Sequence, residues 1–181
     1  MLGKMSRIWG MATLQALQDS DIYAGKTTVQ KLLYFALPAD ERRVFYKPYH
    51  YGPYSEAVQS AFGSLANNEY IVREKTGQYR LATGEEHIGR YQDDPVVRRL
   101  RAASRFLAKK NCTGTQSISI LAKVHLLKQG RDLSESELRD FIRQRGQYFG
   151  WKELTQEALN SDQLQTYIDL ADELEAAFPN V

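Results

Sequence analysis

Residues 26–36, KTTVQKLLYFA, and residues 49–55, YHYGPYS, decide the fold that this sequence predicts. The first stretch repeats apolar side chains at the i, i+3, i+4 and i+7 spacing of one buried helix face. These side chains are Val29, Leu32, Leu33 and Ala36. Thr27 stands three residues before Gln30, as in a capping box that satisfies free N–H groups at a helix start. We therefore expect a helix over residues 27–37, ended by the proline that follows.

The second stretch overlaps the end of residues 44–51, a segment rich in β-branched and aromatic residues. Pro48 interrupts this segment, so it predicts a short edge strand or an extended arm. Gly52 and Pro53 form a turn that also suits the start of a helix. A third helix is therefore expected over residues 55–67, where apolar residues again keep helical spacing.

The segments on either side complete a small domain. Residues 8–18 read as an amphipathic helix, and residues 70–81 read as a β-hairpin whose turn contains a glycine. A capping box of Thr83 and Glu86 then opens a short helix. The order helix, helix, short strand, helix, hairpin is that of a winged helix-turn-helix domain, which we expect over residues 6–92. The predicted fold class is thus mainly α with a small β-hairpin wing.

The remaining residues, 93–181, predict a helical C-terminal extension. Asp94 can cap a helix over residues 95–109, because its side chain can accept from the first free N–H groups. Ser134 and Glu137 form a further capping box. Two more helices are expected over residues 115–129 and 161–178.

The two opening stretches also resemble a known signature. The residues that carry the resemblance are Gln30, Lys31, Leu32, Leu33 and Tyr34 in the helix, and Tyr51, Gly52 and Pro53 in the turn. They are similar to the SocA-like, or Panacea, antitoxin domain and to the related YwgA-like uncharacterised prokaryotic proteins. The resemblance covers roughly residues 8–85 and implies a winged-helix-like regulatory or protein-binding module. It supplies no catalytic residues.

Charge is unevenly distributed along the chain. The 181 residues carry a formal net charge of +2, which excludes a polybasic protein of the histone kind. Residues 70–131 carry +8, however, and residues 132–181 carry −7. Such asymmetry indicates either separate partners for the two regions or mutual attraction within the fold.

The sharpest nucleic-acid signal lies in the helix expected over residues 95–109. Four basic side chains fall within a stripe of roughly 80° on the face opposite the apolar one. This basic stripe consists of Arg98, Arg101, Arg105 and Lys109. It can neutralise successive phosphates of DNA, and Arg73, Lys75 and Arg80 of the hairpin can extend the same surface. The alternative is a solvated face, or one docked against the acidic C-terminal helix.

A protein partner is the second hypothesis, because the helix over residues 55–67 contains no Lys or Arg with which to anchor to phosphate. Four tyrosines precede it: Tyr46, Tyr49, Tyr51 and Tyr54. Tyrosine buries a large area while keeping a polar tip, so such a cluster can hold a toxin or the product of a neighbouring gene. We expect Tyr46 and Tyr49 to make contacts and Tyr51 and Tyr54 to pack within the fold.

Catalysis has little support. His50, His87 and His125 are dispersed without the i, i+4 spacing of a zinc helix, and Cys112 is expected as a free surface thiol. We expect no metal, no cofactor and no enzymatic activity. The absence of a signal peptide and of a long apolar run favours a cytoplasmic protein with no membrane partner. The acidic C-terminal helix offers a surface for a homodimer. The sequence thus predicts a non-enzymatic prokaryotic regulatory protein that binds DNA through its basic middle.

Overall fold

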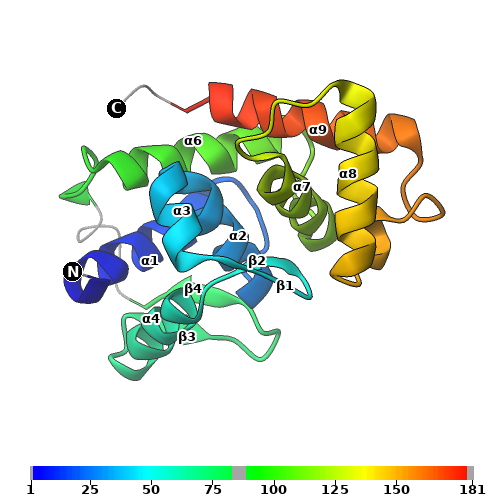
Figure 1. The fold of residues 1–181 in the computed structure, drawn as a ribbon. Coiled ribbons are helices and arrows are strands. Elements are labelled where there is room, and N and C mark those ends of the chain that lie inside the picture. Colours follow the sequence, from blue (N-terminus) through cyan, green and yellow to red (C-terminus); the bar gives the residue numbers. More distant parts are fainter. Residues whose placement is uncertain (1, 83–88, 179–181) are drawn as a thin grey trace.

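The computed structural model describes residues 2–82 and 89–178 of the chain. It is mainly helical with two small β-hairpins (Figure 1). The elements in chain order are α1 (Leu2–Asp19), α2 (Lys26–Ala36), α3 (Ala39–Phe45), β1 (Lys47–Tyr49), β2 (Gly52–Tyr54), α4 (Glu56–Asn67), β3 (Ile71–Arg73), β4 (Tyr79–Leu81), α6 (Pro95–Lys109), α7 (Thr115–Lys128), α8 (Glu135–Tyr148), η1 (Lys152–Leu154) and α9 (Ser161–Ala176). The expected mainly helical chain with a β-hairpin is therefore confirmed.

Helix α2 forms as its apolar spacing predicts, but the expected capping box is wrong. The helix begins at Lys26 after Gly25, and no side chain caps it. The Gln30 amide instead points into the fold, where its Nε2 donates to the Ser55 carbonyl and its Oε1 accepts from the Ser55 N–H. A buried amide with two backbone partners satisfies more polar groups than a cap at an exposed helix start.

The expected edge strand around Pro48 is a hairpin of its own. Strands β1 and β2 pair antiparallel, with Lys47 opposite Tyr54. They form a sheet separate from the β3–β4 hairpin. Gly52 makes the tight turn possible, because its φ of 94° lies in a region that side chains with a Cβ avoid. Helix α3 and this hairpin stand between α2 and α4, where the expected element order has only a short strand.

The C-terminal helices follow their predicted caps. Asp94 accepts from the N–H groups of Val96 and Val97 at the start of α6, and Ser134 and Glu137 form the expected box at α8. The predicted box of Thr83 and Glu86 lies outside the described residues.

The hydrophobic core joins the two predicted regions. One cluster of buried side chains brings residues of α1, α2 and α4 together with residues of α6, α7 and α9. Its members include Leu14, Leu32, Phe62, Leu100, Leu121 and Leu174. A second cluster lies among α7, α8 and α9 around Trp151. The boundary expected at residue 92 is thus bridged by buried side chains. Among the described residues, no helix has both the length and the apolarity to cross a bilayer.

Candidate functional site

The basic stripe lies on the solvent side of α6. Arg98, Arg105 and Lys109 are exposed, and Arg101 is half-buried. The opposite face, which includes Val97, Leu100, Ala103 and Leu107, is fully buried against α1 and α2. Because one face is packed and Asp94 caps the first turn, the helix holds the four cations at fixed spacing.

The acidic helix α9 does not cover this stripe. Its carboxylates bind other cations: Glu175 pairs with Arg42 and Arg99, Glu173 with Lys110, and Asp172 with Lys128. None of the four stripe residues forms an ion pair with any residue in 2–82 or 89–178. The acidic tail and the basic middle therefore do attract each other, but through cations beside the stripe.

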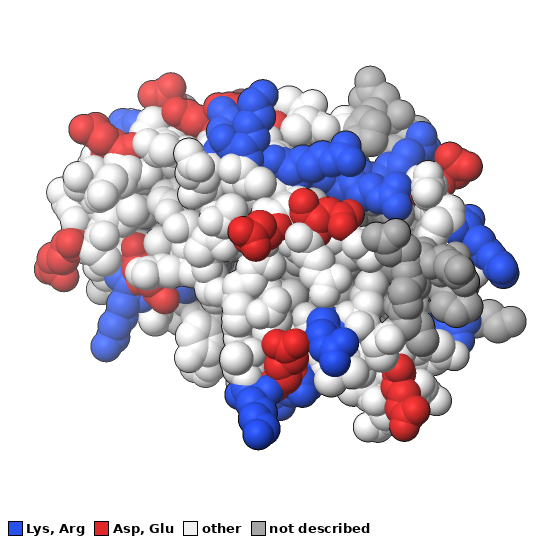
Figure 2. All heavy atoms as spheres, turned by 180° about the vertical axis from the view of Figure 1, so that it is seen from behind, with Lys and Arg blue, Asp and Glu red and all other residues white. Residues whose placement is uncertain are grey.

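The cations of the β3–β4 hairpin belong to a different part of the surface. Arg73, Lys75 and Arg80 are exposed, and Arg80 pairs with Glu74 at 3.2 Å. Helix α1 contacts both β4 and α6 and so lies between the hairpin and the stripe. Figure 2 shows the result: a band of basic side chains runs along the upper edge over α6, and acidic and uncharged side chains separate it from the basic side chains below. Among the described residues, the hairpin therefore does not extend the stripe into one continuous face.

The tyrosines occupy environments that differ from those expected. Tyr46 is buried, and its hydroxyl donates to the Gln30 carbonyl at 3.0 Å, so it is a core residue rather than a contact residue. Tyr51 is 64% exposed at the tip of the β1–β2 hairpin, although it was expected to pack. Tyr49 is 53% exposed, as a contact residue requires, and its ring packs against half-buried Tyr54.

Three side chains hold carbonyl groups of the β1–β2 hairpin, and a fourth holds the carbonyl of Ser55, the residue that follows it. They come from α2, from α7 and from Trp151 at the start of η1. The bonds run from Lys31 Nζ to Pro53 O (2.6 Å), from Ser119 Oγ to Tyr51 O (2.8 Å), from Trp151 Nε1 to Tyr49 O (2.8 Å) and from Gln30 Nε2 to Ser55 O (3.0 Å). The hairpin is therefore fixed by both predicted regions of the chain.

Two buried lysines flank Gly52 beneath this hairpin. Lys123 is fully buried and pairs with Glu153 at 2.9 Å. Lys31 is 2% exposed and has no carboxylate partner among the described residues. Burial, and then the charge of Lys123, lower the pKa of Lys31 to about 7. Lys31 also lines a cleft of about 610 Å³ between α2 and the hairpin.

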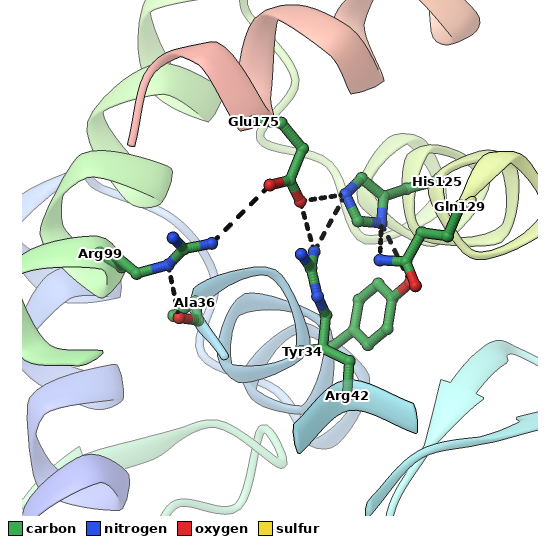
Figure 3. A network of polar contacts seen from close by, with 7 residues as sticks. All are labelled: Tyr34, Ala36, Arg42, Arg99, His125, Gln129 and Glu175. Atoms are coloured by element: carbon green, nitrogen blue, oxygen red, sulfur yellow. Dashed lines mark hydrogen bonds and ion pairs between the residues drawn. The ribbon is translucent and has the colours of Figure 1, made fainter. Parts of the chain in front are cut away.

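A polar network that links Glu175 of α9 to buried side chains below it was not foreseen from the sequence (Figure 3). Nδ1 of His125, in α7, lies 3.0 Å from the Tyr34 hydroxyl. Its other ring nitrogen, Nε2, lies 2.7 Å from Oε1 of Glu175. Arg42 of α3 donates to the same Glu175 oxygen at 2.5 Å. Arg99 of α6 donates to the Ala36 carbonyl at 2.8 Å and reaches the second Glu175 oxygen.

The pKa shifts show how this network is balanced. Burial alone would raise the pKa of Glu175, but hydrogen bonds from His125 and Arg42 hold it at about 2. Burial lowers the pKa of His125 and outweighs the hydrogen bond to Glu175. A neutral His125 with its proton on Nε2 donates to Glu175 and accepts from Tyr34, so the three groups are mutually satisfied. The network therefore joins α9 to α2, α3, α6 and α7.

Cys112 is not the surface thiol that was expected. It is 4% exposed, and burial raises its pKa to about 11, so it is a poor nucleophile at neutral pH. Within residues 2–82 and 89–178, no three His, Cys, Asp or Glu side chains are placed to hold a metal ion.

No protein-family model matches the chain, and no curated protein matches it.

Proposed function

We propose that this chain is a non-enzymatic regulatory protein that binds duplex DNA through the basic stripe of α6. The observation that carries the proposal is that Arg98, Arg101, Arg105 and Lys109 stand free of carboxylates within the described residues, although an acidic helix lies close by. On an ordinary solvent-exposed helix face, cations can be paired with neighbouring carboxylates. On a surface that binds phosphates they must be unpaired, because a carboxylate beside each cation would cancel its attraction for phosphate.

The geometry of α6 suits a phosphate backbone. The stripe runs for about 16 Å along the helix axis, at 1.5 Å per residue, which is long enough to meet several phosphates. The buried face fixes the helix, so little backbone order has to be gained on binding.

The proposal includes a winged helix-turn-helix role for α1, α2, α4 and the β3–β4 hairpin. In that arrangement α4 occupies the position of a recognition helix, yet it contains neither Lys nor Arg. Affinity then comes from phosphate contacts of α6, and base readout by α4 adds little. The expected binding is therefore strong in low salt and weakly dependent on DNA sequence.

The test is duplex binding as a function of salt. Four phosphate contacts predict a slope of log K against log salt of about −3 to −4, so affinity falls about 100-fold between 50 and 200 mM salt. The double variant Arg101→Glu/Arg105→Glu is expected to weaken binding at least tenfold in 50 mM salt and to flatten the slope by about 2.

The matched control is Arg73→Glu/Lys75→Glu, which makes the same change in net charge on the separate hairpin surface. This control is expected to bind nearly as tightly as the parent chain. Equal losses in the two double variants would show attraction to net charge alone and would overturn the α6 interface, as would the absence of binding at 50 mM salt. The hypothesis of a protein partner at the tyrosine hairpin predicts instead that Tyr49→Ala, not Arg101→Glu, abolishes function.

A further inference from the structure

We propose that the cleft between α2 and the β1–β2 hairpin binds a small phosphate monoester carried on a planar ring, such as a nucleotide. The cleft has a volume of about 610 Å³, within the range of pockets that hold small molecules. It lies apart from the α6 stripe and uses none of the stripe residues. The site is therefore independent of the proposed DNA interface.

The first argument is that Lys31, a residue of the cleft lining, has a nearly buried ammonium group without a counter-ion among the described residues. An ammonium group has three N–H donors. That of Lys31 uses one, toward the Pro53 carbonyl, and no other described group accepts from it. Burying a charged lysine without a counter-ion is costly. This nearly buried lysine belongs to the lining of the cleft. An anion in the cleft supplies the missing partner. The lowered pKa agrees with a site that lacks its counter-charge.

The second argument is charge balance at the mouth. Lys26 and Lys47 are exposed on the lining of the cleft, and Glu56 is the acidic residue among the lining side chains. With Lys31 protonated, the described lining carries a formal charge of +2. A phosphate monoester carries about −1.5 to −2 at neutral pH, so it matches this charge more closely than a single carboxylate does.

The third argument is the aromatic rim. Tyr49, Tyr51 and Tyr54 line the same cleft, and two of their rings are already fixed against each other at a centroid distance of 5.1 Å. Such rings bind planar groups by stacking. The hairpin that carries them is held by Lys31, Ser119 and Trp151, so the rim is in place before a ligand arrives.

The experiment is calorimetric titration of the full chain at pH 7 and low salt with adenosine 5′-monophosphate, with adenosine and inorganic phosphate as separate titrants. The monophosphate is expected to bind at least about tenfold more tightly than either fragment. Lys31→Met keeps the buried aliphatic part of the side chain and removes the charge. It is expected to lower the affinity for the monophosphate at least about tenfold. Lys47→Ala at the exposed rim provides a second variant that leaves the core untouched, with an expected loss of several-fold.

Lys75→Met, on the distant β3–β4 turn, is the matched control and should bind like the parent chain. Inorganic phosphate that binds as tightly as the monophosphate would overturn the ring-binding part of the proposal. The proposal as a whole fails if the monophosphate shows no binding at millimolar concentration, or if Lys31→Met and Lys47→Ala both bind it as the parent does. These variants leave the α6 stripe unchanged. A failure of the phosphate site can therefore be distinguished from a failure of DNA binding.

Discussion

The Oε1 atom of Glu175 lies 2.7 Å from Nε2 of His125, which fixes the last turn of α9 above a buried imidazole of α7. The same oxygen accepts from Arg42 at 2.5 Å, and Arg42 is only 4% exposed. One carboxylate therefore neutralises a buried guanidinium and orients a buried histidine. Because Arg42 comes from α3, its contact couples the C-terminal helix to the N-terminal half of the chain.

Replacing Glu175 by Gln is expected to lower the free energy of unfolding by about 2 kcal/mol. The amide keeps the shape but leaves Arg42 buried without a counter-charge, and breaking a buried pair is costly. Solvent screening reduces the loss below that of a fully buried pair, since the Glu175 side chain is 41% exposed. Chemical denaturation measures it. Glu173→Gln, which loses only a surface pair with Lys110, should cost less than about 0.5 kcal/mol. Equal effects would show that Glu175 is an ordinary surface residue.

The same contact predicts how stability responds to acid. The pKa of Glu175 is held at about 2, below its ordinary 4.5, so the unfolded chain takes up this proton first. The contribution of Glu175 is complete above pH 5 and is lost as the pH falls toward 2. His125, whose pKa is lowered by burial, adds a loss of the same sign below pH 6.5. Urea unfolding from pH 7 to 3 should show this fall, and Glu175→Gln should flatten its lower part. A parallel fall in the variant would contradict the assignment.

Some elements of the fold and of the candidate sites can be predicted from the sequence and others cannot, for physical reasons. Helix α6 is predictable because its cap, apolar face and basic stripe lie within one local segment. Helix α3 is not, because its ADERRVF sequence has no buried periodicity and is held by Arg42, which donates to Glu175, 133 positions away. The burial of Lys31 is equally non-local. Lysine is almost always exposed, and only the fold brings the Pro53 carbonyl to its ammonium group.

Gly52→Ala is expected to destabilise the chain by about 2 kcal/mol or more. The residue has a φ of 94°, and an added Cβ would lie 3.0 Å from Cγ of Lys123. Backbone strain and crowding against a buried stem then act together. Thermal unfolding measures the effect. Gly63→Ala in α4 is the matched control, because its Cβ would meet nothing within 4 Å and alanine favours a helix, so it should stabilise by about 0.5–1 kcal/mol. A neutral Gly52→Ala would mean that the β1–β2 hairpin is not held in this turn.

The pH dependence of stability in Lys31→Met tests whether Lys31 carries a buried charge. The pKa of Lys31 is about 7 in the folded chain, against 10.5 ordinarily, so above pH 7 the folded state releases a proton that the unfolded state retains. Stability should therefore rise from pH 7 to 9, by at most about 1.4 kcal/mol per pH unit from this group. Lys123, whose pKa is also lowered by burial, acts in the same direction.

In Lys31→Met the rise in stability between pH 7 and 9 should be smaller, because the methionine carries no proton and Lys123 loses a like-charged neighbour. The variant should be more stable than the parent at pH 6 by about 1 kcal/mol, since replacing an uncompensated buried charge by an apolar group is often stabilising. This advantage should disappear toward pH 9, where Lys31 of the parent is neutral. Lys75→Met, an exposed control, should run parallel to the parent across the range. If Lys31→Met also runs parallel, the ammonium group is not the buried cation on which the proposed phosphate site depends.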